Sequence, residues 1–564
     1  MNRLGLALIS AFSVVTSVQA QQSPHDTIAL QPALRRVDDF VQLSMQASNT
    51  PGLALALVDR SGLIVVRTYG YADLDGRLPV TPATRFEIGS ISKSFTAIAL
   101  LQLQAEGHFD PNRAVRSYLP WFTPASRWRP VTGHDLMTHT AGLPRDRDDV
   151  PSGPGQGYMV RERPLGSPPG SHWAYSNIGW QVLGQLLESL DGSGRYPQII
   201  RRRILEPLDM SSTDAEITNA TRLDLARGYE SVYDDRPTRP TDPLAVAPWT
   251  EYASGDGSIV STPADLGAYL TMLLNRGKGP NGAVLGEAGF AALSTPHAKT
   301  TRGDDSYGYG MFLSRLDGRE IFYHGGGMLG YSSHLIGIPS LGIGAVVFVN
   351  GPGEASRVAR FALRVLGAAL NGDTLPDASP PKPPWHIEHP ENYAGTYHDP
   401  SGDSLVFAAS GDSLLLLQDG KHTALERYGE DSFLGPAPEF ALFPIRFGRD
   451  SGGVTEVWYG GHWFAGPRYR GPRTFSPPKE WLAYTGHYRI TQPWEPNFRI
   501  VLRKGRLWWV GPEGDEEELT PIGPAEFRVG EPRSAERLRF ETILDGKAVK
   551  AILSGMTYYR FFTP

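Results

Sequence analysis

Residues 86–97 carry the sequence FEIGSISKSFTA, and this stretch decides how the rest of the chain is interpreted. The apolar residues from Phe95 onward recur at helical spacing up to Gly107, which predicts a helix over residues 94–106. Ser90 and Lys93 are three residues apart at the start of this helix and therefore lie on one face, about one turn apart. A serine is a weak nucleophile without a nearby base, and the lysine amine is a candidate for that base.

An S-x-x-K pair alone is a weak signal, because many surface helices carry it, but three further segments supply context. LMTHTAGLP spans residues 136–144. YSNIGWQVLG begins at Tyr175 and leads into a second expected helix over residues 179–190. HGGGMLGYSS begins at His324, before two expected buried strands over residues 334–338 and 343–349. Glycines at that position allow the backbone to approach a ligand closely.

These four segments, in this order, resemble the penicillin-recognising serine hydrolases of peptidase family S12. That family includes class C β-lactamases, DD-carboxypeptidases, D-aminopeptidases and β-lactamase-like esterases. The resemblance covers roughly residues 30–370. It implies an α+β fold, namely a β-lactamase/transpeptidase-like catalytic domain.

The resemblance also implies a role for each site residue. Ser90 would attack a carbonyl and carry the acyl group, while Lys93 and Tyr175 would move the protons. The sequence does not decide which of these two is the acylation base. Asn177 would orient the lysine and bind the substrate amide. The glycines at Gly326 and Gly327 would shape the oxyanion hole, in which one donated N–H contributes about 3 kcal/mol.

The third motif departs from the β-lactamase pattern. No Lys-Thr-Gly or Lys-Ser-Gly triplet occurs in the chain, and His324 stands where the lysine would be. A histidine is charged only part of the time near neutral pH, so it is a poorer partner for a substrate carboxylate. We therefore expect weak β-lactam hydrolysis at most.

Proline-rich stretches divide the rest of the chain. Residues 373–386 form an expected linker after a hydrolase domain at residues 21–372. Two blocks follow, at residues 387–474 and 479–564. Each opens with the pattern Tyr-x-Gly-x-Tyr and continues with short alternating segments, which predicts a tandem pair of eight-stranded antiparallel β-barrels. This order is similar to that of bacterial D-aminopeptidases, whose tail domains are lipocalin-like.

In that group a loop from the last domain reaches the catalytic cleft. Residues 511–519 here carry the sequence GPEGDEEEL. One hypothesis is that an acidic side chain of this loop contacts the free amine of a peptide substrate; the candidates are Glu513, Asp515, Glu516 and Glu517. The alternative is a solvated acidic turn.

Composition excludes several classes of function. The chain has 564 residues and no cysteine, which excludes disulfides, thiolate metal sites and a cysteine nucleophile. With 54 Lys and Arg against 60 Asp and Glu, the net charge of −6 argues against a nucleic-acid partner. Residues 1–20 have the pattern of a cleavable signal peptide cut after Ala20, which predicts a periplasmic or secreted protein without a membrane span.

Two other hydrolase types are less well supported. An α/β-hydrolase needs a G-x-S-x-G elbow, and the sequence Gly330–His334 lacks the final glycine. A metal hydrolase needs a cluster such as H-E-x-x-H, and the nearest approach is His386-Ile387-Glu388-His389 beside the linker.

The sequence thus predicts an exported serine hydrolase that forms an acyl-enzyme on Ser90 and needs no cofactor. The preferred substrate class is a short peptide or amide, as for a D-aminopeptidase or carboxypeptidase, and degradation of linear peptides fits this architecture. A carboxylesterase acting on short acyl esters is the first alternative. A catalytically dead binding protein is the second. The oligomeric state, the stereochemical preference and the natural substrate stay open.

Overall fold

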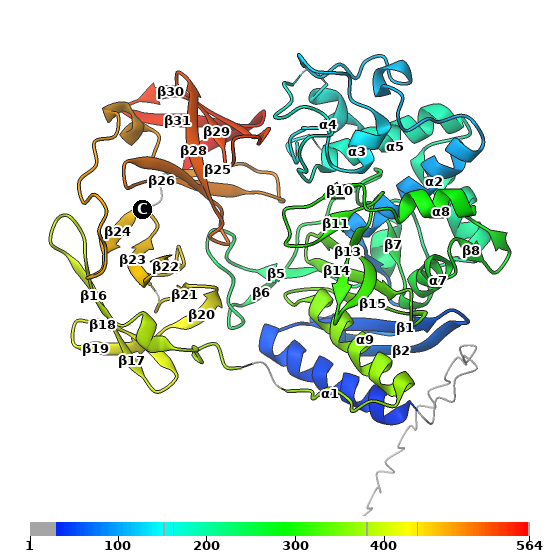
Figure 1. Cartoon of the computed structure of the whole chain (residues 1–564), viewed down its shortest axis with the longest axis horizontal. Coiled ribbons are helices and arrows are strands. Elements are labelled where there is room, and N and C mark those ends of the chain that lie inside the picture. The colour runs from blue at the N-terminus through cyan, green and yellow to red at the C-terminus, as the bar shows by residue number, and fades with distance from the viewer. Residues whose placement is uncertain (1–29, 151–152, 162, 380–381, 437, 562–564) are drawn as a thin grey trace, which may run out of the picture.

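A computed structural model describes residues 30–561 except 151–152, 162, 380–381 and 437. The expected signal peptide lies outside these residues. The first part of the chain is built on a nine-stranded antiparallel sheet of order β10-β11-β12-β13-β14-β15-β1-β2-β3 (Figure 1). Its strands are β1 (Gly52–Asp59), β2 (Gly62–Asp73), β3 (Leu78–Pro79), β10 (Ala298–Lys299), β11 (Ser306–Tyr307), β12 (Phe312–Leu316), β13 (Arg319–Met328), β14 (Tyr331–Ile338) and β15 (Ile343–Val349).

Helices cover both faces of this sheet. Helices α1 (Gln31–Ser48) and α9 (Ala355–Asn371) pack together on one face, and Phe40 stacks on Phe361 with ring centroids 3.8 Å apart. Helix α7 (Pro263–Leu274) packs on the other. Every residue of β1 and β15 is buried, as expected for strands that are covered on two sides.

A helical region is inserted between the two halves of the sheet. Its helices are α2 (Ser92–Ala105), α3 (Gly133–Met137), α4 (Gly153–Met159), α5 (Asn177–Asp191), α6 (Tyr196–Ile200) and α8 (Glu287–Leu293). Short strands pair within the same part of the chain: β4 (Phe86–Glu87) with β7 (Val260–Ser261), β5 (Tyr229–Ser231) with β6 (Leu244–Val246), and β8 (Lys278–Gly279) with β9 (Gly282–Ala283). Helix α2 is the centre of this region and contacts α5, α6 and α8. The predicted helices over residues 94–106 and 179–190 are confirmed as α2 and α5.

The first of the two predicted barrels has nine strand segments rather than eight. They are β16 (Gly395–His398), β17 (Ser404–Ser410), β18 (Ser413–Gln418), β19 (Lys421–Ala424), β20 (Glu426–Gly429), β21 (Ser432–Leu434), β22 (Ile445–Asp450), β23 (Gly453–Tyr459) and β24 (His462–Ala465). Only Leu425 separates β19 from β20, which are the two ends of the sheet order. Its N–H donates to the Leu414 carbonyl and its side chain is buried, so one long strand is interrupted where the sheet curls back on itself.

The second barrel is closed and has the eight strands expected. They are β25 (Gly486–Arg489), β26 (Asn497–Arg503), β27 (Arg506–Val510), β28 (Glu516–Gly523), β29 (Glu526–Val529), β30 (Arg537–Leu544), β31 (Lys547–Leu553) and β32 (Met556–Phe561). The repeated Tyr-x-Gly-x-Tyr pattern has the same role in both barrels. Tyr397 donates its hydroxyl to the Tyr393 carbonyl at 2.9 Å, and Tyr488 donates to the Tyr484 carbonyl at 2.8 Å.

The hairpin β5–β6 connects the catalytic part of the molecule to both barrels (Figure 1). Arg239 in its loop forms an ion pair with Glu426 of the first barrel at 3.0 Å. Asn497 of the second barrel donates to the Asp234 carbonyl in the same loop at 2.7 Å. These contacts fix the second barrel beside the catalytic domain. Within the residues described, no helix is long and apolar enough to cross a bilayer.

Candidate active site

Ser90 lies in a 3₁₀ turn, Gly89–Ile91, that leads directly into α2. The side chain of Lys93, one turn further on, is fully buried. Its Nζ donates to Ser90 Oγ at 2.8 Å, to Asn177 Oδ1 at 2.8 Å and to the Asp256 carbonyl at 2.9 Å. Three acceptors therefore surround the lysine nitrogen and hold it in place. The structure thus brings the predicted serine, lysine and asparagine together.

The Asn177 amide is held from its other side as well. Its Nδ2 donates to Asp146 Oδ1 at 2.7 Å, and Arg145 forms an ion pair with the second carboxylate oxygen of Asp146 at 3.1 Å. The carboxylate can only accept, so it fixes which end of the amide faces Lys93. Asp146 was not among the predicted site residues, although it lies only two residues beyond the LMTHTAGLP segment.

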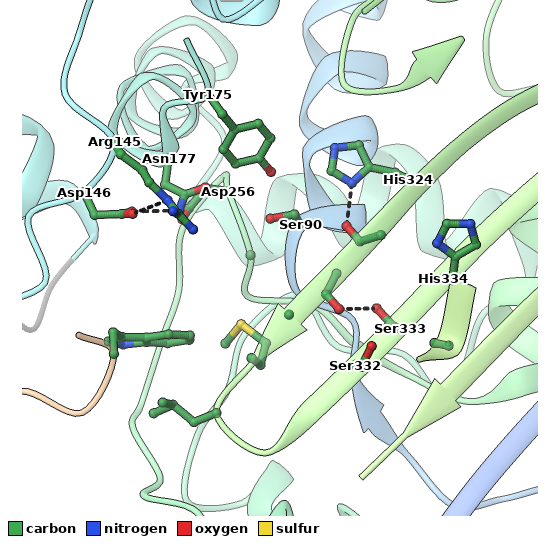
Figure 2. Close-up of a pocket in the computed structure, with 18 of the residues that line it drawn as sticks. Ser90, Arg145, Asp146, Tyr175, Asn177, Asp256, His324, Ser332, Ser333 and His334 are labelled. Atoms are coloured by element: carbon green, nitrogen blue, oxygen red, sulfur yellow. Dashed lines mark hydrogen bonds and ion pairs between the residues drawn. The ribbon is translucent and has the colours of Figure 1, made fainter. Parts of the chain in front are cut away.

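Tyr175 precedes α5, and its hydroxyl points toward Ser90 (Figure 2). Its ring lies against the His139 ring, with centroids 4.2 Å apart, and Lys93 Nζ is 5.0 Å from its centroid. The Ser176 N–H donates to His139 Nδ1 at 3.0 Å. Burial holds the pKa of His139 well below its usual value, so this ring is an uncharged support for the tyrosine. The LMTHTAGLP segment therefore positions Tyr175.

The glycines of β13 allow this strand to pack against the Ser90 turn. A Cβ atom at Gly326 would lie 1.9 Å from the Ile88 carbonyl oxygen, which no side chain can tolerate. Gly89 has a φ of 49°, and a Cβ there would lie 2.7 Å from the Gly327 carbonyl oxygen. The backbone of Gly327 is therefore held against the turn that carries Ser90. This is the arrangement required for an oxyanion hole built from two backbone N–H groups.

His324 is buried on the other side of the pocket from Asp146 (Figure 2). Its Nδ1 is 2.6 Å from the Gly325 carbonyl oxygen and its Nε2 is 3.1 Å from the Tyr307 hydroxyl. Burial, with Lys93 nearby, lowers the pKa of His324 to about 3. The expectation of a partly charged histidine is therefore wrong, because this ring is neutral near pH 7. The cation that lines the pocket near this ring is Arg302, which sequence analysis missed.

The cavity around these residues has a volume of about 800 Å³, a size typical of small-ligand sites. Two of its lining residues, Trp494 and Glu495, come from the loop between β25 and β26 of the second barrel. Burial and the charge of Asp146 raise the pKa of Glu495 to about 7. Burial and the same neighbour raise the pKa of Asp148, also in the lining, to about 9. Carboxyl groups thus gather at one end of the pocket, around Arg145, and we call this the acidic end.

Comparison with known proteins agrees with this geometry. The model of the family described as beta-lactamase matches residues 37–369. The chain belongs to the beta-lactamase family. It is thereby a member of the penicillin-recognising serine hydrolases, as its motifs predicted.

Two curated relatives are 25% and 29% identical to the chain over the residues that match. Protein flp of Staphylococcus aureus (strain NCTC 8325 / PS 47) is 25% identical over 329 residues, which are 56% of this chain and 63% of that protein. Unguisins hydrolase ungD' of Aspergillus campestris (strain IBT 28561) is 29% identical over 341 residues, 55% of this chain and 60% of that protein. The matches thus span less than two thirds of either relative.

Solved structures show the same fold. The octameric penicillin-binding protein homologue from Pyrococcus abyssi superposes with a TM-score of 0.58 at 23% identity, covering 76% of this chain and 99% of that one. EstCE1, a hydrolase with promiscuous acyltransferase activity, superposes with a TM-score of 0.50 at 22% identity, covering 60% and 99%.

The acidic loop at residues 511–519 does not reach the family's catalytic pocket. Of the described residues that line this pocket, none is Glu513, Asp515, Glu516 or Glu517. Glu513 instead accepts from Thr238 Oγ1 at 2.7 Å and from the Tyr428 hydroxyl at 2.6 Å. Glu516 forms a two-pronged ion pair with buried Arg503. The loop therefore joins the two barrels and the β5–β6 hairpin, and the loop over residues 490–496 reaches the pocket in its place.

The His386–His389 segment shows no sign of a metal site. His386 Nδ1 lies 2.6 Å from Asp412, and His389 Nδ1 lies 3.1 Å from Glu391. Across the part of the chain that the structure describes, no group of three or more His, Asp or Glu side chains is arranged to hold a metal ion.

Proposed function

We propose that the protein hydrolyses amide bonds of short peptides through an acyl ester on Ser90. The observation that carries this proposal is the fully buried Lys93 amine at 2.8 Å from Ser90 Oγ, held there by two further hydrogen bonds. Such an amine can relay the serine proton during attack on a carbonyl. An S-x-x-K pair on an ordinary surface helix would leave the amine in water.

The steps follow from the positions of these groups. Ser90 Oγ forms a bond to the substrate carbonyl carbon while its proton passes to Lys93 or Tyr175. The negative oxygen is stabilised by the N–H groups of Ser90 and Gly327. Tyr175, which faces the nucleophile, receives this proton directly or by way of Lys93 and delivers it to the leaving nitrogen, and the C–N bond breaks. Water then attacks the ester by the same route in reverse and releases the acid and Ser90.

The acidic end of the pocket supports a substrate with a free amino group. Asp146 is already paired with Arg145 and Asn177, whereas no hydrogen bond of the Glu495 carboxylate occurs among the described residues. An ammonium group next to Glu495 would relieve the repulsion from Asp146 that contributes to its raised pKa. This arrangement favours an aminopeptidase, with the acyl residue of the substrate lying toward the second barrel.

A carboxylesterase is the second candidate. The neutral state of His324 favours it, because no permanent cation occupies the position where a family β-lactamase has its lysine. An ester substrate needs no carboxylate recognition there.

One set of kinetic measurements separates these candidates. We would compare kcat/KM for D- and L-alanyl p-nitroanilide with that for p-nitrophenyl acetate, using Ser90→Ala as the control. Strong turnover of an anilide that depends on Ser90 supports the peptidase. Turnover of the ester alone supports the esterase. Failure of a fluorophosphonate or a β-lactam to label Ser90 in the folded protein would support a dead hydrolase with a binding role.

Export of the protein is part of the same proposal, since the pattern at residues 1–20 favours a cleavable signal peptide. Fractionation of the producing cells, followed by N-terminal sequencing of the mature protein, tests it. A mature chain that begins at Gln21 outside the cytoplasm is the expected result, and an uncleaved chain inside the cell would contradict it.

A further inference from the structure

A second large cavity lies next to the catalytic pocket. Its volume is about 1170 Å³, and it is enclosed by the end of α7, helix α8, strands β11–β13 and the β14–β15 turn. Leu273, Phe290 and Phe322 give it an apolar lining. Five cationic side chains surround this lining: Arg60, Arg276, Lys299, Arg302 and Arg315. We call this cavity the basic groove.

Among the described residues, only Arg315 of these five cations has an acidic partner, and two of the other four, Arg276 and Arg302, lie over aromatic rings. Arg276 places its guanidinium 5.2 Å from the Phe290 ring centroid, and Arg302 places its own 4.8 Å from the Phe312 centroid. Stacking on an aromatic face holds a guanidinium in place and leaves its N–H donors free for an anion.

The three acidic residues of the groove, Asp304, Asp305 and Glu320, offset only part of the charge of its five cations. Asp305 is occupied by the hydroxyls of Ser314 and Tyr323. Glu320 lies 3.7 Å from Arg315, near the limit of an ion pair. The remaining carboxylate, Asp304, is exposed on the turn between β10 and β11. The groove therefore keeps an excess of positive charge above an apolar lining.

Arg302 connects the basic groove to the catalytic pocket, because it lines both cavities. It belongs to the turn between β10 and β11, near His324 and across the pocket from the acidic end. A linear substrate whose amino end faces Glu495 would leave the pocket on the Arg302 side. Its distal part would then enter the groove.

We infer that the basic groove binds the acidic distal part of an extended peptide substrate whose reacting amide lies at Ser90. This inference rests on the proposed peptidase function and adds to it a preference for carboxylate side chains several residues beyond the scissile bond. Charge complementarity with Arg276 and Arg302, and continuity with the catalytic pocket, select this occupant.

The test compares two peptides that differ only in distal charge: alanyl-Gly-Gly-Asp-Asp-Asp amide and alanyl-Gly-Gly-Asn-Asn-Asn amide. We expect kcat/KM to be about tenfold higher for the Asp peptide at low salt, and the ratio to fall toward one in 0.5 M NaCl because exposed charges are screened. Arg276→Glu should lower the ratio at least fivefold. Arg319→Glu is the matched control, because Arg319 is an exposed arginine of β13 outside the groove, and it should leave the ratio unchanged.

Each outcome has a separate meaning. Equal turnover of both peptides by the wild-type protein would overturn the groove inference and leave the peptidase proposal intact. An equal response to the two arginine variants would also overturn it. If neither peptide is cleaved, the peptidase proposal fails. A binding measurement then tests whether the basic groove prefers the acidic peptide. Fluorescence anisotropy of the labelled peptides with full-length Ser90→Ala should then show tighter binding of the Asp peptide, weakened by Arg276→Glu. Equal binding of the two peptides would overturn the inference that the groove binds an acidic peptide segment.

Discussion

The connection between the first two strands differs sharply between the two barrels. In the first barrel, residues 399–403 fold back on Asp399, whose carboxylate accepts the N–H groups of Ser401, Gly402 and Asp403 at 2.8–2.9 Å. The hydrogen bonds of this exposed turn are therefore made within the turn itself. In the second barrel, the loop over residues 490–496 reaches the catalytic pocket, where Trp494 and Glu495 form part of the lining.

Hydrogen bonds within the loop over residues 490–496 hold its conformation. The side chain of Gln492, itself buried, accepts from the N–H of Trp494 at 2.6 Å and donates to the Glu495 carbonyl at 2.6 Å. Tyr558 of β32 donates to the same carbonyl at 3.1 Å. One barrel of the pair thus keeps a purely local turn, while the equivalent connection of the other barrel contributes to a distant site. In our proposal, the loop that differs is also the one that selects the substrate.

The largest expected effect tests whether the chemistry belongs to the catalytic domain alone. Lys93→Met removes the amine that bridges Ser90, Asn177 and Asp256, so proton transfer from the nucleophile loses its relay. We expect kcat/KM to fall about 10³-fold on both an anilide and an ester. Steady-state kinetics with an intact second barrel measure this. A loss below tenfold would mean that Tyr175 alone can serve as the base.

The next prediction concerns the loop that differs between the two barrels. Replacing residues 490–496 by the turn 399–403 removes Trp494 and Glu495 from the pocket while keeping a connection native to this fold. If Glu495 binds the substrate ammonium, the ratio of kcat/KM for alanyl p-nitroanilide to that for its N-acetyl form should fall about tenfold to a hundredfold.

The matched control for this replacement lies in the first barrel. Asp399→Ala disrupts the local turn there and should leave the same ratio unchanged within a factor of two. A loop replacement with no effect on the ratio would show that the second barrel, like the first, has no part in selecting the substrate.

The comparison also shows how far sequence analysis could go. That the site residues lie together around Ser90 could be predicted because each motif is short and local: Ser90 and Lys93 share one helical turn, and Gly326 is required by a single close approach. The repeat predicted the two barrels in the same way. The first barrel's interrupted strand at Leu425 could not be predicted, since it depends on where the curled sheet meets itself.

The acidic loop over residues 511–519 is the wrong candidate for a substrate contact, because only its density of charge favours it. Residues Glu516 to Glu518 belong to strand β28, where Glu516 is paired with Arg503 of β26 and Glu518 with Arg506 of β27. The difference between the two repeats was the better signal. Aligning the barrels on their tyrosine motifs places residues 399–403 opposite residues 490–496, where the second repeat is two residues longer and carries Pro493-Trp494-Glu495-Pro496.

A smaller effect is expected at Asp146, which we assign as a positioning residue. Asp146→Ala frees the Asn177 amide to rotate, so its oxygen no longer faces Lys93 reliably. We expect kcat to fall about tenfold with little change in KM, and Asp146→Asn to restore most of it, because the asparagine oxygen can still accept from Asn177. Equal losses in both variants would mean that the negative charge matters rather than the orientation.

The pH dependence of substrate selection should be weaker still. Because the pKa of Glu495 is raised to about 7, its carboxylate forms as the pH rises through neutrality, whereas Asp148, with its pKa raised to about 9, stays protonated. Between pH 5.5 and 7.5 a substrate amine remains largely protonated, so the preference for alanyl over N-acetylalanyl p-nitroanilide should increase about threefold to tenfold. Glu495→Gln should flatten this increase, and a preference that falls as pH rises would contradict it.

The smallest effect is expected from substitutions in the two Tyr-x-Gly-x-Tyr motifs. Tyr397→Phe and Tyr488→Phe each remove a hydroxyl bonded to the carbonyl four residues earlier, which should destabilise the local barrel by about 1 kcal/mol. Strand β25 ends at Arg489, directly before the loop that lines the pocket, so Tyr488→Phe should also lower the preference for a free amine about twofold. Tyr397→Phe should not, since its barrel supplies no residue to the pocket lining among those described.

Hydrogen exchange of β16 and β25 measures the loosening, and kcat/KM ratios measure the preference. If loosening the first barrel changed the preference equally, the barrels would act on the pocket as one unit through the β5–β6 hairpin, and the independence of their loops would have to be abandoned.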